Sequence, residues 1–423
     1  MKVLSKKIIS LIIFLFLILT LIIFINFQNP DKLKSYVNKY LWPYTPLKIQ
    51  VILKIFYDKN YVNQFLNDYN VKFLPNTQFI KLDLKKYNLD FLTNSTGIYN
   101  KKTVRKSFYI ELVDNNIWII DNIGSIYSIN KDDNFNDESV IDNYDRILSN
   151  LKPYQILDTL IVDDKIYFSF VSKNDDCYKF NIFFSKINKN QLNFKKFFTP
   201  LECMGSIIQG GRMQNYSHMN KDGLLFTIGD SSTPDFIGGD AQNDSSIYGK
   251  IIFKEFSNQE DFTIISKGHR NPQGLFVDNN SVISTEHGPK GGDEINKIVF
   301  GKNYGWPIAS YGSSYSKKDL KYKKSHEGYG FEEPIFSFVP SIGISEIIKI
   351  PENFNESWKN NFLIASLNGR SLYRVKFSSD FKKVLFYEKI FIGERIRDLK
   401  YDFNSKLILI ALESKGNLGL IKN

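Results

Sequence analysis

The sequence predicts an all-β fold, a six-bladed β-propeller, preceded by an N-terminal transmembrane helix. Two observations support this prediction. Residues 8–25 form one long apolar run, and from about residue 71 short runs of Ile, Phe, Tyr and Val alternate with turns rich in Asn, Asp, Gly and Lys. Little helical periodicity is sustained in this second part. We therefore divide the chain into a membrane anchor (1–27), a membrane-proximal spacer (28–70) and the propeller (71–423).

The N-terminal run has the properties of an uncleaved membrane anchor. It contains eighteen residues, of which only Ser10 and Thr20 are polar. At about 1.5 Å per residue, this length nearly matches a hydrocarbon core of about 30 Å. Three lysines precede the run and should stay cytoplasmic, which predicts a single-pass inner-membrane protein with its propeller in the bacterial periplasm. A cleaved signal peptide is the alternative, but no Ala-x-Ala cleavage pattern follows the run.

The propeller is predicted from a unit that occurs six times. Each copy is a polar turn followed by an apolar strand, and the spacing between copies varies, as expected for blades joined by loops of different lengths. The copies occupy residues 114–120, 163–168, 221–226, 279–283, 360–364 and 404–408. Because the spacing is unequal, two stacked β-sandwiches stay open as an alternative.

Charge and cysteine content limit the classes of function. The chain carries 55 Lys and Arg against 45 Asp and Glu, a net charge of +10, but the basic residues are scattered, so no nucleic acid is expected as a partner. Cys177 and Cys203 are its two cysteines, and in an oxidising compartment such a pair favours a disulfide over two free thiols. The sequence contains no phosphate-binding loop, His-Glu-x-x-His helix or Gly-x-Ser-x-Gly elbow.

Three segments predict a polar ligand pocket at the loop end of the propeller. They are dense in glycine, proline and polar residues and comprise 268–274 (Gly-His-Arg-Asn-Pro-Gln-Gly), 286–296 and 301–307. Glycine lets the backbone approach a ligand closely, and Arg beside Asn offers a forked cation and an amide suited to carboxylate and quinone oxygens. The alternative is a set of structural turns with Arg270 in a salt bridge.

These segments are followed by Pro-Ser-Ile at 340–342, Trp-x-x-Asn-x-Leu at 358–363 and Arg-Ile-Arg-Asp at 395–398. In this order the motifs resemble the glucose/sorbosone dehydrogenase family, clearly from about Gly205 to the C-terminus and faintly over 71–200. Members of that family are six-bladed propellers that use pyrroloquinoline quinone (PQQ) and Ca²⁺. The resemblance implies a membrane-anchored PQQ-dependent aldose sugar dehydrogenase that oxidises a sugar C1 hydroxyl by hydride transfer to PQQ.

The resemblance also implies the residues of the site. It implies quinone contacts by Arg270 and Asn271, Ca²⁺ ligation by the backbone carbonyls of Gly288 and Pro289, and binding of the cofactor carboxylates by Arg395 and Arg397. Such a set suits the group, because PQQ carries three carboxylates and arginine binds carboxylates in a bidentate manner. Ca²⁺ prefers hard oxygen ligands and can polarise a carbonyl.

One catalytic position departs from the family pattern. The family has a histidine four residues before an arginine, whereas this chain reads Ile-Gln-Gly-Gly-Arg from Ile208 to Arg212. Isoleucine cannot accept the proton of the C1 hydroxyl, and loss of a general base costs about a hundred- to ten-thousandfold in rate. A shifted register would make His218 the substitute. The second hypothesis is therefore a non-catalytic propeller that binds a sugar, a quinone or a protein partner.

Four further residues are weaker candidates. Asp230 follows the third repeat and is expected to contact a substrate or to stabilise a turn. Tyr304 and Trp306 are expected to pack between blades, with stacking on a sugar as the alternative, and Asp293 to support the neighbouring glycine-rich loop. The substrate, the electron acceptor and the oligomeric state do not follow from the sequence.

Overall fold

A computed structural model of the chain describes residues 82–92, 95–96, 104–132, 138–141, 153–175, 177–188, 191–204, 209–230, 239–257, 261–278, 281–314 and 322–423. These residues belong to one compact unit, Ile80–Asn423. The predicted anchor (1–27) and spacer (28–70) lie outside the described residues. Within the described ranges, no helix combines the length and the apolar character needed to cross a membrane.

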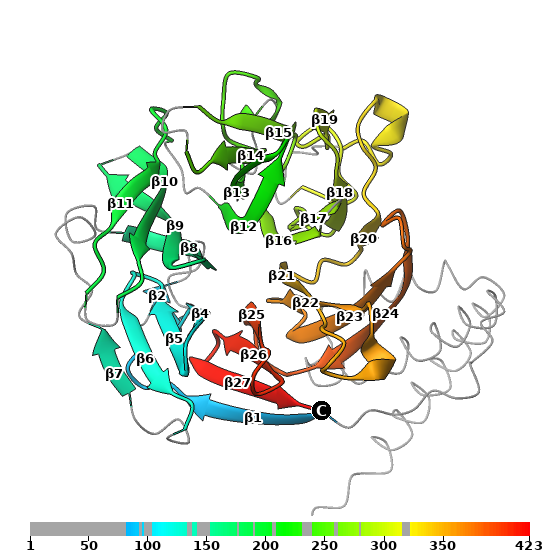
Figure 1. Cartoon of the computed structure of the whole chain (residues 1–423). Coiled ribbons are helices and arrows are strands. Elements are labelled where there is room, and N and C mark those ends of the chain that lie inside the picture. The colour runs from blue at the N-terminus through cyan, green and yellow to red at the C-terminus, as the bar shows by residue number, and fades with distance from the viewer. Residues whose placement is uncertain are drawn as a thin grey trace, which may run out of the picture. The chain divides into compact units, whose positions relative to one another are not determined.

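Six antiparallel sheets stand in a ring and form the blades of a propeller (Figure 1), which confirms the predicted fold. Blade 1 contains β4 (Phe108–Val113), β5 (Asn116–Asp121), β6 (Ile126–Asn130) and β7 (Glu138–Ile141). Blade 2 contains β8 (Pro153–Val162), β9 (Lys165–Asn174), β10 (Cys177–Lys186) and β11 (Lys195–Phe198). Blade 3 contains β12 (Gly210–His218), β13 (Lys221–Ile228), β14 (Lys250–Glu255) and β15 (Thr263–Lys267), with β19 (Lys302–Asn303) added in parallel.

The second half of the ring is built in the same way. Blade 4 contains β16 (Pro272–Asp278), β17 (Ser281–Glu286), β18 (Asp293–Ile298) and β20 (Phe336–Phe338). Blade 5 contains β21 (Ile344–Lys349), β22 (Phe362–Ser366), β23 (Ser371–Phe377) and β24 (Val384–Phe391). Blade 6 contains β25 (Ile396–Asp402), β26 (Leu407–Leu412), β27 (Asn417–Lys422) and β1 (Asp83–Asn88). The remaining elements are the pair β2 (Ser95–Thr96) and β3 (Val104–Arg105) and the short 3₁₀ helices η3 (Asp240–Gln242), η4 (Glu327–Tyr329) and η5 (Glu356–Trp358).

The six predicted repeats are the second strands of the six blades, each with its preceding turn. These strands are β5, β9, β13, β17, β22 and β26. In three of the turns, Asp114, Asp163 and Asn360 have φ angles of 53°, 53° and 58°, in the left-handed region that Asp and Asn tolerate better than most residues. The polar turns therefore identify the first hairpin of each blade, and the alternative of two sandwiches is wrong.

The innermost strands form a closed ring. Each of β4, β8, β12, β16, β21 and β25 contacts its two neighbours around the axis. The circle is completed in blade 6, where β1 pairs with β27 from Asp83 opposite Lys422 to Asn88 opposite Asn417, and Figure 1 shows these two strands side by side. Blade 6 is thus made from both ends of the described chain.

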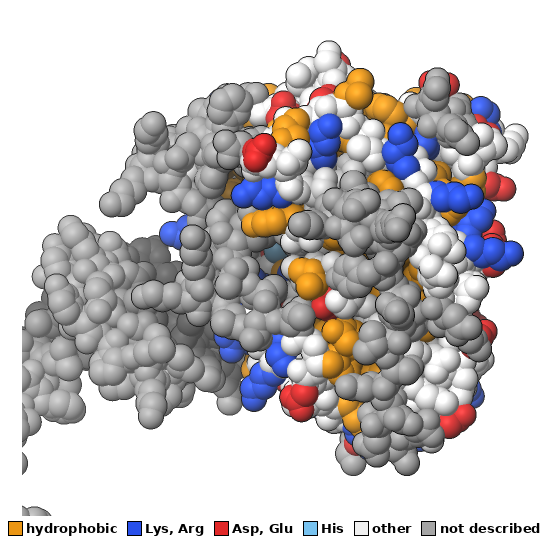
Figure 2. All heavy atoms as spheres, turned by 90° about the vertical axis from the view of Figure 1, so that its left-hand side faces the viewer, with side chains coloured by type: hydrophobic (Ala, Val, Ile, Leu, Met, Phe, Trp, Pro, Cys, Tyr) orange, Lys and Arg blue, Asp and Glu red, His pale blue; other side chains and the backbone are white. Residues whose placement is uncertain are grey.

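Large apolar side chains fill the spaces between adjacent blades. Between blades 2 and 3, for example, the rings of Phe180 and Phe226 stack with centroids 5.9 Å apart. A disulfide joins Cys177 at the start of β10 to Cys203 beyond β11, with a Cα–Cα distance of 5.3 Å. On the face in Figure 2, Lys and Arg side chains are distributed among Asp, Glu and hydrophobic side chains, so the basic residues are not gathered into one patch there.

Candidate functional site

The innermost strands carry irregularities at the residues that build the site. Five of the six lose their regular register with the second strand of their blade, and β4 alone keeps it. The residues at or beside these shifts are Leu157 and Asp158 in β8, Gly211 and Arg212 in β12, Gln273 in β16, Ser345 and Glu346 in β21, and Arg397 and Asp398 in β25. A β-bulge bends its strand and re-aims a side chain, and most of these residues are polar.

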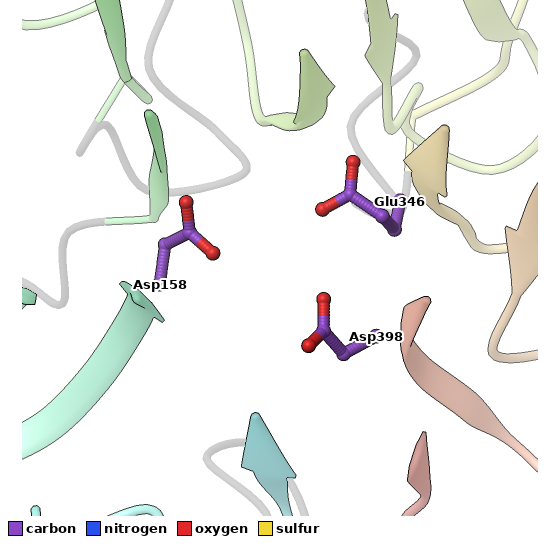
Figure 3. A group of neighbouring side chains, drawn as sticks. All are labelled: Asp158, Glu346 and Asp398. Atoms are coloured by element: carbon purple, nitrogen blue, oxygen red, sulfur yellow. The ribbon is translucent and has the colours of Figure 1, made fainter. Parts of the chain in front are cut away.

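Three carboxylates from different blades meet at one guanidinium group. Asp158, Glu346 and Asp398 point toward one another at the centre of the ring (Figure 3). Arg212 Nη1 lies 2.8, 2.5 and 3.0 Å from the oxygens of these three residues, in that order, and all four side chains are buried. The backbone N–H of Ile110 in β4 donates to Asp398 (2.9 Å). We call the three carboxylates and Arg212 the hub.

The hub holds more potential negative charge than positive charge. Burial raises the pKa of Asp158 to about 6 and that of Glu346 to about 8, because the carboxylates lose hydration and Arg212 compensates only in part. Ligand atoms of the three acidic residues lie within 4.8 Å of one another, a spacing that could hold a metal ion. The Arg212 guanidinium already lies among them, so we assign the hub a structural role.

Arg212 also connects the hub to the residues that the sequence assigned to ligand binding. Its Nε donates to the backbone oxygen of Gln273 (2.7 Å), and its Nη2 donates to the backbone oxygen of Arg397 (2.9 Å). The Gln273 side chain donates to Asn271 Oδ1 (2.9 Å) and accepts from Arg397 Nη1 (3.0 Å). One buried arginine therefore supports the backbone around both Asn271 and Arg397.

Arg395 and Arg397 share a single buried carboxylate. Arg395 Nε lies 2.5 Å from one oxygen of Glu413, and Arg397 Nη2 lies 2.8 Å from the other. Burial alone would raise the pKa of Glu413, but Arg397 and Arg395 outweigh it and lower the pKa to about 2. Glu413 thus stays ionised and keeps the two guanidinium groups next to each other.

Arg270 is held by backbone oxygens and by an aromatic ring. Its Nη1 donates to the backbone oxygens of His287 (3.1 Å) and Gly288 (2.9 Å). Its guanidinium carbon lies 5.2 Å from the centroid of the Trp306 ring, within the range of a cation–π interaction. Trp306 Nε1 in turn donates to Asp230 Oδ2 (2.8 Å). Trp306 and Asp230 therefore fix the orientation of Arg270.

The charges of all three arginines influence the pKa of the His287 side chain. Burial is the largest cause that lowers the pKa of this imidazole, to about 4; Asp293 opposes the shift, and Arg270, Arg397 and Arg395 add to it. Guanidinium groups from residue 270 and from residues 395–397 thus both lower the pKa of the His287 imidazole. The arrangement produces a positive potential that suits an anionic ligand.

The glycine-rich loop that follows His287 is rich in backbone oxygens. A Cβ atom on Gly288 would lie only 2.1 Å from the oxygen of Gly292 and 2.4 Å from that of Gly291, so glycine is required there. Gly288 N donates to Asp293 Oδ1 (3.1 Å), while Asp293 Oδ2 accepts the backbone N–H groups of residues 342–344. Asp293 supports this loop, and hard backbone oxygens are the donors that Ca²⁺ prefers.

The structure brings Arg270, Asn271, Arg395 and Arg397 together, but it does not bring His218 to them. Gly210 begins β12, and its N–H donates to Asn271 Oδ1 (3.2 Å). His218 ends the same strand, roughly 26 Å away at about 3.3 Å per residue. There it packs against Phe253 and Phe300, with ring centroids 5.4 Å away in each case. Ile208, the predicted base position, lies outside the described residues.

Three residues important for this geometry do not follow from the sequence, and a fourth, Trp306, has a contact beyond the expected one. Arg212 and Gln273 lie inside quoted motifs, so their polar character was visible, but their contacts depend on β-bulges. Trp306 was expected to pack between blades, yet it also contacts Arg270. Glu413 lies in a segment without any recognised motif, and only the fold places it between two arginines.

The fold and the site together define a class of protein, a six-bladed propeller with an arginine-rich, anion-accepting site beside its axis. Residues 111–420 match the family model described as glucose / sorbosone dehydrogenase. The match covers most of the chain, and the chain belongs to this family.

Individual relatives are similar over shorter stretches. The aldose sugar dehydrogenase YliI of Escherichia coli is 34% identical over 159 residues, which cover 37% of this chain and 42% of that protein. Quinoprotein glucose dehydrogenase B of Acinetobacter calcoaceticus is 34% identical over 115 residues, 27% of this chain and 22% of that protein. The chain spans about half the length, or less, of the curated relatives that it matches.

Solved structures agree with the fold. The soluble aldose sugar dehydrogenase of Escherichia coli in its apo-form has a TM-score of 0.63 at 22% identity, covering 80% of this chain and 99% of that chain. The PQQ-bound aldose sugar dehydrogenase of Streptomyces coelicolor has a TM-score of 0.56 at 18% identity, covering 81% and 98%. At these identities the similarity establishes the propeller fold.

Proposed function

We propose that the chain is a membrane-anchored, PQQ-dependent aldose sugar dehydrogenase that oxidises the C1 hydroxyl of a sugar. The observation that supports it most is the grouping of arginines: Gln273 joins Arg397 to Asn271, Arg397 and Arg395 share Glu413, and Arg270 donates to the backbone oxygen of His287. PQQ carries three carboxylates, and a cluster of guanidinium groups at a partly buried site is suited to bind it.

Each arginine would contribute differently to binding. Arg395 and Arg397 share Glu413 as their counter-ion, so together they keep a net positive charge for a carboxylate. Among the described residues, no carboxylate lies within 4.0 Å of the Arg270 guanidinium, which is bound by backbone oxygens instead. Asn271 follows Arg270 in the chain, is joined to Arg397 through Gln273, and offers its amide. When bound, PQQ supplies an orthoquinone that accepts a hydride from the sugar C1.

The family also implies Ca²⁺, and the loop at residues 288–289 fits it. The loop supplies backbone carbonyls, which are hard oxygen donors, and those of Gly291 and Gly292 lie beside Gly288. We propose that the carbonyls of Gly288 and Pro289 hold the ion, which would polarise the carbonyl that accepts the hydride. Arg270 Nη1 already donates to Gly288 O (2.9 Å). Because a carbonyl oxygen has two lone pairs, this bond leaves one for a cation.

A non-catalytic binding module is the second candidate, and the identity of Ile208 favours it. An isoleucine at the family's histidine position cannot accept a proton, and His218 lies at the far end of β12. Such a protein would keep the cofactor or sugar site without rapid turnover.

Reconstitution separates the two candidates. The full chain in detergent is titrated with PQQ at saturating Ca²⁺, and binding is followed by absorbance; dye reduction is then measured with a panel of aldoses. Binding with turnover supports the dehydrogenase. Binding without turnover supports the binding module. Absence of binding contradicts PQQ as the cofactor of a dehydrogenase and also as the ligand of a binding module.

We also propose that residues 1–27 anchor the protein in the inner membrane, with the propeller in the periplasm. The lysines before the apolar run support this orientation. In cell fractions washed with alkaline carbonate, the full chain should stay with the membranes, and a variant lacking residues 1–27 should not. Protease added to intact spheroplasts should cleave a periplasmic propeller, whereas protection would contradict the orientation.

A further inference from the structure

A chain of side-chain amides runs across the ligand site from β12 to β25. The N–H of Gly210 donates to Asn271 Oδ1 (3.2 Å). Gln273 Nε2 donates to the same oxygen (2.9 Å), and Gln273 Oε1 accepts from Arg397 Nη1 (3.0 Å). The chain therefore joins blades 3, 4 and 6 through two amide groups.

The direction of this chain is fixed at both ends. A backbone N–H and a guanidinium group can only donate, so the oxygen of Asn271 must face Gly210 and the oxygen of Gln273 must face Arg397. Only this orientation satisfies both contacts, which settles an assignment that heavy-atom positions alone leave ambiguous. Asn271 Oδ1 thus accepts two hydrogen bonds from the protein, and Nδ2 is the group it can offer to a ligand.

Gln273 is suited to hold this orientation because its backbone is also fixed. It is the residue at the register shift between Pro272 and Gly274 in β16, where a bulge re-aims a side chain. Its backbone oxygen accepts from Arg212 Nε (2.7 Å), and Arg212 is bound to the three hub carboxylates. The position of the Gln273 amide is therefore set by the hub.

We infer that Gln273 is a positioning residue that makes the Asn271 amide a hydrogen-bond donor toward the ligand. With that orientation, the side chains assigned to ligand binding all present N–H donors, namely Arg270, Asn271, Arg395 and Arg397. The site then selects a ligand whose facing groups are acceptors only, such as carboxylates and quinone carbonyl oxygens. This inference rests on the proposed function, because its ligand is PQQ.

Two substitutions test the role of Gln273. Gln273→Met keeps the length of the side chain but removes both hydrogen bonds without adding charge. Gln273→Glu keeps an acceptor for Arg397 but places an oxygen against Asn271 Oδ1. We expect both variants to bind PQQ about 10- to 100-fold more weakly, with a changed absorption spectrum of the bound quinone. Gln214→Met is the matched control, because Gln214 donates to Leu275 O (2.9 Å) on the same pair of strands without contacting Asn271.

A double-mutant cycle shows whether Gln273 acts through Asn271. If it does, Gln273→Met should weaken PQQ binding little further in an Asn271→Ala background. Full additivity would overturn the inference, as would threefold or weaker effects of both Gln273 variants with an unchanged spectrum. Thermal unfolding of each variant without PQQ identifies one that fails to fold. The PQQ affinity of the other Gln273 variant then tests the inference. Absence of PQQ binding by the unmodified protein would instead overturn the proposed function, and this inference with it.

Discussion

Replacing Arg212 by Met should destabilise the propeller more than removal of any surface charge. The substitution keeps an extended side chain but leaves Asp158, Glu346 and Asp398 without the cation that contacts all three. It also removes the hydrogen bonds to the backbone oxygens of Gln273 and Arg397. Removing one partner of a buried ion pair typically costs about 3–5 kcal/mol, because the remaining charge stays buried and unpaired.

The loss of unfolding free energy in Arg212→Met should depend on pH. Between pH 7 and pH 5 Asp158 takes up a proton, since its folded-state pKa is about 6, whereas Glu346, with a pKa of about 8, is already largely protonated at pH 7. A protonated carboxyl group needs no counter-ion, so the difference in unfolding free energy between the unmodified protein and Arg212→Met should shrink at pH 5.

Urea unfolding followed by circular dichroism measures this difference at both pH values. Lys186→Met is the matched control, because Lys186 and Asp164 form an exposed pair at 3.0 Å with side chains 77% and 57% accessible. We expect little change in stability for this control. A loss below about 1 kcal/mol for Arg212→Met, or the same loss at pH 5 and pH 7, would refute the structural role of the hub.

Three further predictions follow from described residues and from the sequence. Glu346 has a pKa raised from 4.5 to about 8; the folded state therefore binds its proton more tightly, and stability should fall as pH rises from about 4.5 to about 8. Glu346→Gln should flatten that part of a profile of thermal midpoint against pH, and an unchanged slope would contradict the assignment. Replacing both Cys177 and Cys203, which are 26 positions apart, by Ser should lower the free energy of unfolding by about 3.5 kcal/mol; equal urea midpoints would show that the cross-link does not constrain the unfolded chain. Ile208→His should raise the dye-reduction rate with aldoses in the PQQ-loaded protein, and no increase would show that the alignment of this segment is wrong.

Local signals explain how much of the fold could be predicted. In three blades the turn before the second strand has a residue with positive φ, and Asp114, Asp163 and Asn360 tolerate that conformation. Such turns are visible in the sequence because their chemistry depends only on adjacent residues. The arginines of the site were likewise visible, because they stand in motifs.

The hub could not be predicted in this way. Asp158 and Glu346 lie in apolar strands without a motif, and strand alternation alone does not show that a register shift directs each toward the axis. Their partner Arg212 comes from a different blade, so the cluster exists only once the ring is closed. Contacts between distant segments of this kind depend on topology rather than on local sequence.

The pairing of β1 with β27 also has a consequence for biosynthesis. As the chain leaves the ribosome, β1 is made before every other strand of the ring, but its partner is made last. The edge of β1 must therefore stay unpaired until β27 has been made, and the nascent protein exposes a strand that could associate with other chains. We expect slow completion of the final blade and a benefit from chaperones that bind extended segments.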